Sequence, residues 1–193
     1  MPSIPGLKRA YDILTPDEEA ALIVLIETSG LAYSAYDPGN RRSSASYGWK
    51  YDYATDSFAP CAPIPEGFRA IADKAAAFSG LAYGDFAECL LNRYEPGAVI
   101  QPHLDKPVWE QVIGVSLGVP TTMIFREPGS GEEQPIELLP RSIYMLAGDA
   151  RHVWQHSLPP MQGTRYSITF RSFSAEGLRR LEQCPAEVRT IEI

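Results

Sequence analysis

The chain has 193 residues, of which 45% are hydrophobic and 21% are charged, and its formal net charge is −7. These values are typical of a folded protein with a sizeable core, and they argue against a protein that coats long duplex DNA, which would usually be basic. No apolar run approaches the roughly 18 residues that cross a bilayer, and the N-terminus lacks the apolar core of a signal peptide. We therefore expect a cytoplasmic monomer without a membrane partner.

Two helices are predicted in the first half of the chain. In "LTPDEEAALIVLIETSG", Thr15 and Glu18 form a capping box and Gly30 follows the helix end. The second helix lies in "EGFRAIADKAAAFSG", where Gly80 is the stop signal. Between them, residues 31–53 alternate loosely and predict short strands and loops, and the proline-rich "SFAPCAPIPEG" predicts a connector.

From residue 86 onward the pattern changes to short runs rich in β-branched and aromatic residues, such as "FAECLLNRY", "VIGVSLG", "SIYMLAG", "HVWQHSL" and "RYSITFRSF". Turn residues separate these runs, as in "EPGA" and "AGDA". This spacing predicts a β-sandwich or barrel, and "SAEGLRRLEQ" predicts a terminal helix. The expected fold class is mainly β with flanking helices (α+β).

The stretch "QPHLDKP" places His103 two positions before Asp105, so both side chains would share one face of a strand. A metal site needs a third ligand, and the two remaining histidines are His152 and His156. Two histidines and a carboxylate form the facial triad of non-haem Fe(II) oxygenases, and the same set can describe a catalytic zinc site.

The run "RYSITFR" alternates strictly, with Arg165, Ser167 and Arg171 on its polar face. If this face lines a barrel lumen, two buried guanidinium groups need anionic partners, and a small dicarboxylate supplies both. Asn92 and Tyr94 share one face of another strand and add an amide and a phenol that suit carboxylate oxygens. Iron and a dicarboxylate together point to 2-oxoglutarate.

The series "NRYEPG", "HLD", "VSLG", "RSIYMLAGDARHVWQH" and "RYSITFR" resembles the AlkB family of Fe(II)/2-oxoglutarate dioxygenases over roughly residues 89–173. The resemblance implies a double-stranded β-helix, which is a relative of the jelly roll, in one AlkB-like domain over 1–193. Helices and a recognition segment would occupy about 1–85, the β-helix core about 86–173 and a tail 174–193. It also implies Fe(II), 2-oxoglutarate and O2 as cofactors.

Carried over residue by residue, the resemblance implies His103, Asp105 and His156 as the iron ligands and catalytic centre, and it leaves His152 as a packing or supporting residue. It implies that Arg165 and Tyr94 hold the distal carboxylate of 2-oxoglutarate, and that Asn92 and Arg171 lie near the carboxylate that chelates iron. Ser167 stands where the bacterial type member has asparagine.

The segment "NRRSSASYGWKYDY" resembles the nucleotide-recognition segment of the family, and it is closer to a tRNA-acting animal homologue than to the DNA-repair type member. Aromatic side chains stack on flipped bases and cations hold phosphates, so Arg42, Tyr47, Trp49 and Tyr51 are the candidate substrate-binding residues. Pro107 stands where the type member has an acidic residue that helps to choose the base.

The resemblance implies an oxygenase that hydroxylates or oxidatively demethylates alkylated bases in a short or single-stranded segment of DNA or RNA, tRNA included. Two alternatives remain open at this point. One is a protein or small-molecule hydroxylase that uses the same chemistry, which the net charge of −7 favours. The other is a non-catalytic binding module that keeps the fold.

Overall fold

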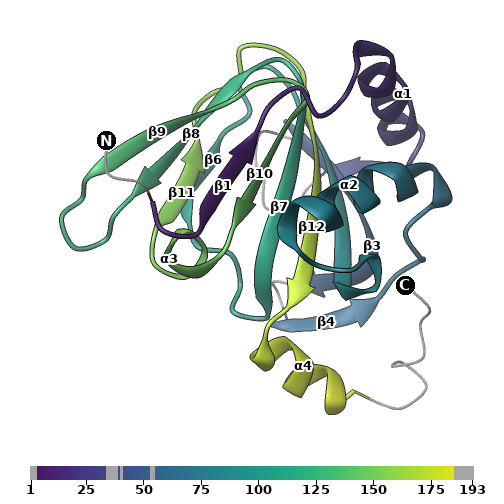
Figure 1. Cartoon of the computed structure of the whole chain (residues 1–193), viewed down its shortest axis with the longest axis vertical. Helices are drawn as coiled ribbons and strands as arrows, with labels where there is room; N and C mark the ends of the chain where they lie inside the picture. The colour runs from purple at the N-terminus through teal and green to yellow at the C-terminus, as the bar shows by residue number, and fades with distance from the viewer. Residues whose placement is uncertain (1–3, 34–38, 40, 53–54, 185–193) are drawn as a thin grey trace.

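The computed structural model describes residues 4–33, 39, 41–52 and 55–184 (Figure 1), so Asn40 and Tyr53 of the recognition segment and the end of the expected tail lie outside the described residues. The strands are β1 (Leu7–Ala10), β2 (Ala32–Tyr33), β3 (Arg42–Asp52), β4 (Ser57–Pro60), β5 (Phe86–Tyr94), β6 (Ile100–His103), β7 (Trp109–Gly118), β8 (Thr121–Arg126), β9 (Glu133–Leu138), β10 (Ser142–Leu146), β11 (Gln155–Leu158) and β12 (Arg165–Phe173). The helices are α1 (Pro16–Glu27), α2 (Arg69–Ser79), α3 (Gly148–His152) and α4 (Ala175–Glu182), with short 3-10 turns at Glu66–Phe68 and Tyr83–Asp85.

The predicted helix ends are confirmed. At the start of α1, the Thr15 hydroxyl accepts a hydrogen bond from the Glu18 backbone, and the Glu18 carboxylate accepts one from the Thr15 backbone. This capping box satisfies amide donors that the first turn leaves unpaired. Helix α2 ends at Gly80, whose φ of 80° is a left-handed conformation that favours glycine.

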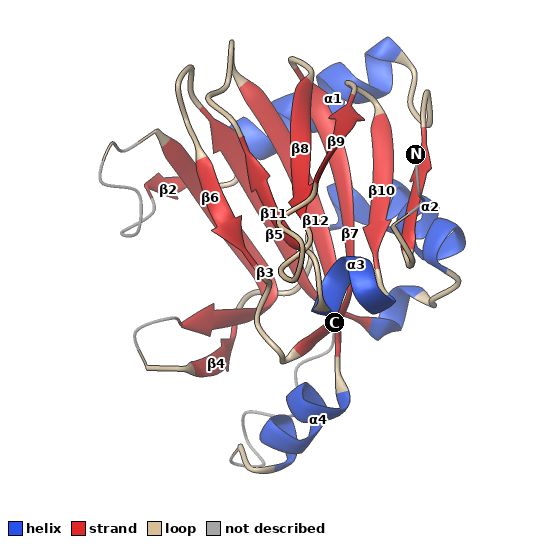
Figure 2. Ribbon diagram, turned by 90° about the vertical axis from the view of Figure 1, so that its left-hand side faces the viewer, coloured by secondary structure: helices blue, strands red, loops and turns tan. Residues whose placement is uncertain are grey.

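In the part of the chain that the structure describes, the strands form two sheets. The larger has eight strands in the order β1-β10-β7-β12-β5-β3-β2, with β4 attached to β3, and the smaller has four strands in the order β6-β11-β8-β9. All strand pairs are antiparallel. Figure 2 shows the strands of both sheets in front of α1 and α2, which lie together on one side of the larger sheet. This is the arrangement expected of a jelly-roll relative.

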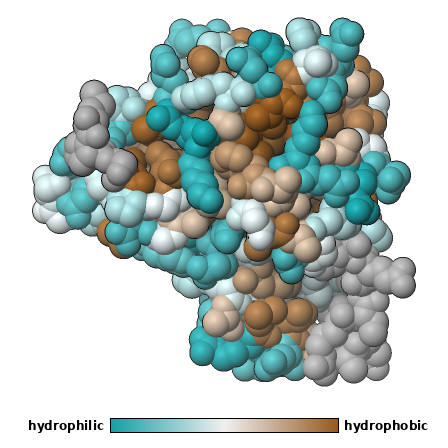
Figure 3. Space-filling model, viewed as in Figure 1, coloured by the Kyte–Doolittle hydropathy of each residue, from teal (hydrophilic) through white to brown (hydrophobic). Residues whose placement is uncertain are grey.

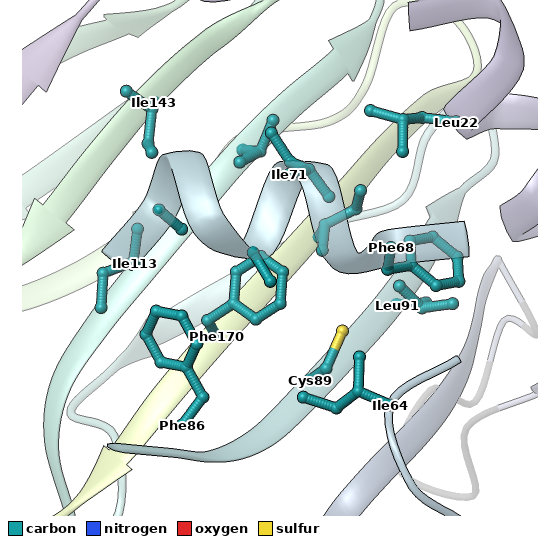
Figure 4. Packing of buried hydrophobic residues seen from close by; sticks show 14 of the residues in the cluster. Leu22, Ile64, Phe68, Ile71, Phe86, Cys89, Leu91, Ile113, Ile143 and Phe170 are labelled. Atoms are coloured by element: carbon teal, nitrogen blue, oxygen red, sulfur yellow. The ribbon is translucent and has the colours of Figure 1, made fainter. Parts of the chain in front are cut away.

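The outer face of the larger sheet packs against α1 and α2. Figure 4 shows Ile71 and Phe68 of this helical layer above strand residues that include Phe170 and Leu91. Phe86 and Phe170 stack with ring centroids 4.9 Å apart. Burial of this apolar layer anchors β5, β7 and β12, and these strands then present their other faces to the smaller sheet.

A second cluster lies between the two sheets. Its members come from both, among them Tyr144 and Val112 of the larger sheet and Phe125 and Leu158 of the smaller sheet. Because this cluster fills only part of the space between the sheets, it leaves room for the polar side chains described below. The surface in Figure 3 mixes hydrophobic and hydrophilic areas, and none of the described helices is long and apolar enough to cross a membrane.

Two local predictions are corrected. Residues 42–52 form one strand of eleven residues, longer than the short strands expected there, because β3 pairs with β5 on one side and then with β4. The run "HVWQHSL" is not one strand: His152 ends α3, and β11 begins only at Gln155. The stretch "AGDA", which was predicted to be a turn, therefore leads directly into helix α3.

Candidate metal and cosubstrate site

Three candidate metal ligands converge between the sheets. His103 ends β6, Asp105 follows two residues later in the loop to β7, and His156 lies on β11 directly opposite His103 in the strand register. One ligand atom from each of the three lies within 4.8 Å of the others. The two imidazole ring centroids are 4.4 Å apart, and Asp105 Oδ2 is 3.8 Å from His156 Nε2.

The donor atoms of these three residues fit a divalent metal. His103 Nδ1 is 2.8 Å from the carbonyl oxygen of Gln101, so this nitrogen carries the proton and the lone pair of Nε2 is left for a metal. Asp105 Oδ2 is buried and has no hydrogen-bond partner among the described residues. A buried carboxylate oxygen without a partner is costly, and a metal ion at this position would remove that cost.

The protonation states of the cluster are those that metal binding requires. Burial lowers the pKa of His156 to about 4, so the imidazole is neutral at pH 7. Burial acts to raise the pKa of Asp105, but nearby positive charges, led by that of Arg171, outweigh it and hold this pKa below its ordinary range. The site therefore presents a carboxylate and a neutral imidazole, with no proton to be displaced from either.

Arg171 lies beside the metal cluster and bridges two acidic residues. Its Nη2 is 3.2 Å from Asp105 Oδ1, and its Nη1 is 2.5 Å from Glu88 Oε2. The sequence predicted Arg171 as a cosubstrate contact but did not single out Glu88. Glu88 sits on the inward face of β5, and its position within "FAECLLNRY" carried no signal, because one acidic residue in a strand usually faces solvent.

Arg165 has the hydrogen-bonding pattern of an anion-binding residue. Its side chain is 1% exposed, and Nε donates to Ser116 Oγ at 3.2 Å. Nη1 and Nη2 are buried and have no hydrogen-bond partner among the described residues. The guanidinium lies 5.1 Å from the centroid of the Tyr94 ring. Two parallel unsatisfied donors on a buried cation match the two oxygens of a carboxylate.

The strand register explains why the predicted cosubstrate residues share one face. Arg165 pairs with Tyr94 across β12 and β5, and Ser167 pairs with Asn92, so all four side chains point between the sheets. Asn92 Nδ2 donates to Ser167 Oγ at 3.4 Å. The inward face predicted for "RYSITFR" is thus what the structure has.

A cavity of about 90 Å³ connects the metal cluster to two of these residues, Asn92 and Tyr94. Its lining includes His103, Asp105, His156, Arg171, Asn92, Tyr94, Arg42 and Tyr144. A larger hollow of about 500 Å³, lined by residues such as Trp49 and Leu178, shares no lining residue with this cavity, and it brings together no metal-binding set among the residues that the structure describes. We therefore take the smaller cavity as the functional one, because the chemistry converges there.

The structure separates the four residues predicted to contact substrate. Arg42 lines the cavity and pairs with Tyr94 in the register. Tyr47 faces the helical layer, where its hydroxyl donates to the carbonyl oxygen of Ser29 at 3.3 Å. Trp49 and Tyr51 are 2% and 6% exposed and belong to a third apolar cluster. Their burial away from the cavity lining makes packing the main role that the structure gives these three aromatic residues.

Two further residues support the site and were not predicted from the sequence. Arg151 is 1% exposed and donates to the carbonyl oxygens of Asp105 at 3.2 Å and Trp109 at 2.7 Å, and also to that of Lys106. It therefore fixes the loop that carries the metal-binding carboxylate. Tyr144 reaches the cavity across Gly114, where a Cβ atom would come within 2.2 Å of its ring.

His152 was expected to pack near or support the metal site, but the structure places it on the surface. Its side chain is 41% exposed, and Nε2 lies 3.4 Å from Glu110 Oε1. This residue belongs to α3 and not to the strand expected over "HVWQHSL". The metal-binding group found among the described residues does not include it.

Comparison with known proteins gives a consistent picture. A sequence profile of the 2OG-Fe(II) oxygenase superfamily matches residues 32–171. The chain is 28% identical over 165 residues to the tRNA (carboxymethyluridine(34)-5-O)-methyltransferase alkbh8 of Xenopus tropicalis, covering 82% of this chain and 26% of that protein. It is 31% identical over 127 residues to the alpha-ketoglutarate-dependent dioxygenase AlkB of Escherichia coli K12, covering 58% of this chain and 57% of that protein.

The fold also has a solved counterpart. The structure of OsALKBH1 superposes with a TM-score of 0.72 at 18% sequence identity, covering 89% of this chain and 99% of that chain. At this identity the likeness concerns the fold alone. The chain spans about a quarter of the length of the Xenopus relative and just over half of the length of the bacterial one.

Proposed function

The chain belongs to the AlkB family of the 2OG-Fe(II) oxygenase superfamily, and from this premise we propose that it is a dioxygenase that hydroxylates or oxidatively demethylates alkylated bases in nucleic acid. The observation that carries the proposal is one cavity that joins a two-histidine, one-carboxylate cluster to Tyr94, whose ring lies 5.1 Å from the guanidinium of Arg165, an inward-facing arginine with two unmet donors among the described residues. The first feature suits Fe(II), and the second suits a dicarboxylate such as 2-oxoglutarate.

The metal cluster and the arginine beside Tyr94 have distinct tasks in this proposal. When bound, Fe(II) together with 2-oxoglutarate and O2 supplies the oxidising chemistry that hydroxylates a C–H bond, and an N-methyl group hydroxylated in this way is lost as formaldehyde. His103, Asp105 and His156 hold the metal. Arg165 binds the distal carboxylate, with the Tyr94 ring fixing the guanidinium plane. Burial between the sheets keeps bulk water away from the reacting carbon.

The nucleic-acid part of the proposal rests on Arg42 and on the family. The Arg42 side chain lines the cavity at the end where β3 meets Tyr94, which suits a contact with a phosphate or a base next to the target. The names of two relatives refer to a tRNA nucleotide and to an alpha-ketoglutarate-dependent dioxygenase, AlkB. The net charge of −7 favours a short contact with nucleic acid over an extended one.

The test is a direct comparison of substrates. N-methylated RNA and DNA oligonucleotides and an N-methylated peptide would be incubated with the protein, Fe(II), 2-oxoglutarate and ascorbate, and loss of methyl groups would be followed by mass spectrometry. We expect demethylation of an oligonucleotide, none with His103→Ala, and a selective loss with Arg42→Ala that leaves substrate-independent succinate formation intact.

The alternatives give different results in the same experiment. Turnover of the methylated peptide alone would replace the proposal with a protein hydroxylase, for which the acidic net charge is the supporting observation. Absence of succinate formation in protein shown to be loaded with Fe(II) would indicate a binding module. Within the proposal the protein acts as a cytoplasmic monomer, which light scattering coupled to gel filtration would check for the oligomeric state.

A further inference from the structure

Glu88 is a buried acidic residue for which the proposed chemistry has no use. It lies on β5 directly opposite Arg171 of β12 in the strand register, and it is 3% exposed. Burial raises the pKa of this carboxyl group, while Arg171 and a hydrogen bond from Ser46 act in the opposite direction. A carboxylate in such a place is costly to bury unless specific contacts compensate for its lost hydration.

The position of Glu88 is tied to that of the metal-binding carboxylate through Arg171. One end of the guanidinium is held by Glu88 Oε2 at 2.5 Å and the other contacts Asp105 Oδ1 at 3.2 Å. An arginine that contacted Asp105 alone would keep several rotamers, because its side chain has four rotatable bonds. The second carboxylate fixes the guanidinium plane, so that Nη2 stays on Oδ1.

The consequence for Asp105 concerns which of its oxygen atoms is left for the metal. Oδ1 is occupied by Arg171, whereas Oδ2 is buried, has no hydrogen-bond partner among the described residues and lies 3.8 Å from His156 Nε2. The carboxylate is thereby oriented to bind a metal through one oxygen only. Outer partners that orient a ligating side chain commonly change metal affinity by about 10-fold to 100-fold.

The local backbone leaves room for this arrangement. On the other side of β5, the residue that pairs with Glu88 is Gly48, which has a φ of +78°. A Cβ atom there would come within 2.4 Å of the Ala87 carbonyl oxygen, so this position takes no side chain. Residue 48 therefore has no side chain that could compete with Arg171 for the Glu88 carboxylate.

We propose that Glu88 is a positioning residue for the metal site, which acts by clamping Arg171 onto Asp105 Oδ1 and so reserving Oδ2 for the metal. This inference rests on the proposed function only in requiring that the cluster binds a divalent cation. It requires no nucleic-acid substrate and no turnover. It assigns to Arg171 the role of a bridge between two carboxylates in addition to any contact with the cosubstrate.

The experiment measures Mn(II) binding by electron paramagnetic resonance, because Mn(II) is a redox-stable stand-in for Fe(II). We expect Glu88→Gln to weaken Mn(II) binding by about 10-fold or more and Glu88→Asp to fall between this variant and the wild type. The matched control is Glu19→Gln, which alters a second largely buried carboxylate that pairs with an arginine, Arg141, away from the cavity. The control should lower the melting temperature and leave Mn(II) affinity unchanged.

A double-mutant cycle separates positioning from a general structural effect. In an Arg171→Met background, Glu88→Gln should cause no further loss of Mn(II) affinity, since the bridge is already missing. If Glu88→Gln binds Mn(II) within twofold of the wild type, or weakens it equally with and without Arg171, the inference is wrong. If Glu88→Gln does not fold, Glu88→Asp in both backgrounds gives the same decision. Failure of the wild type to bind Mn(II) would instead overturn the proposed function.

Discussion

Replacing Arg165 with methionine should weaken the binding of 2-oxoglutarate without lowering the stability of the ligand-free protein. The guanidinium can donate two charge-assisted hydrogen bonds through Nη1 and Nη2, which have no partner among the described residues. Each bond of this kind contributes about 1.5 to 3 kcal/mol, so the pair contributes about 3 to 6 kcal/mol. Since about 1.4 kcal/mol changes a binding constant tenfold, 2-oxoglutarate should bind the variant about 100-fold to 10,000-fold more weakly.

The stability of the ligand-free protein should not fall with this substitution. Arg165 is a buried cation that makes one hydrogen bond, to Ser116, and leaves two nitrogen atoms unsatisfied. Each unsatisfied buried donor costs about 1 to 3 kcal/mol, and methionine removes that cost while keeping most of the side-chain volume. We expect an unchanged or higher melting temperature without ligand.

Arg151→Met is the matched control, because Arg151 is equally buried but donates to three backbone carbonyl groups. Its loss should lower the free energy of unfolding by about 3 kcal/mol or more. The assays are isothermal titration calorimetry with 2-oxoglutarate in the presence of Mn(II), and thermal unfolding without ligand. The role given to Arg165 is wrong if Arg165→Met binds 2-oxoglutarate within threefold of the wild type, or if it destabilises the ligand-free protein as much as the control does.

Three further predictions concern the metal ligands, the effect of pH and the contact between Gly114 and Tyr144. Asp105→Asn and His103→Ala should each abolish Mn(II) binding seen by calorimetry while the fold, followed by circular dichroism, is kept; tight binding by either variant would contradict the assignment. Burial lowers the pKa of His156 from 6.5 in the unfolded chain to about 4 in the folded, metal-free protein. The unfolded chain therefore binds a proton at this residue more readily than the folded protein does. The free energy of unfolding of the metal-free protein should have its full value above pH 6.5 and should fall by about 3 kcal/mol as the pH drops from 6.5 towards 4. Denaturant unfolding at a series of pH values measures this change, and the change should be smaller in His156→Gln. Gly114→Ala should cost about 1 to 3 kcal/mol, because its Cβ would come within 2.2 Å of the Tyr144 ring, and Tyr144→Val in the same chain should restore the stability seen in thermal melts.

The local signals predicted the elements better than their pairing. The capping box at Thr15 and the stop at Gly80 mark helix ends correctly, because caps depend on a few adjacent residues. The alternation in "RYSITFR" gave the inward face of β12 for a similar reason. The length of β3 and the presence of α3 were not predicted, since both depend on partners distant in the chain.

The same distinction holds within the site. His103 and Asp105 were found from their spacing, and the family resemblance selected His156 as the third ligand. Glu88 and Arg151 were missed, because nothing near them in the sequence shows that they are buried. Their roles arise from register and loop geometry: β5 places Glu88 opposite Arg171, and α3 points Arg151 at the loop of Asp105.

The placement of the ligands on different layers has a mechanical consequence. His103 and His156 belong to the smaller sheet, whereas Arg165 and Arg171 belong to the larger one. A metal ion and a dicarboxylate bound at the same time would therefore link the smaller sheet to the larger one. Binding of the metal ion and the dicarboxylate should slow hydrogen exchange at the backbone amides of β6 and β11 more than at those of β12, because the outer face of β12 already packs against the helices.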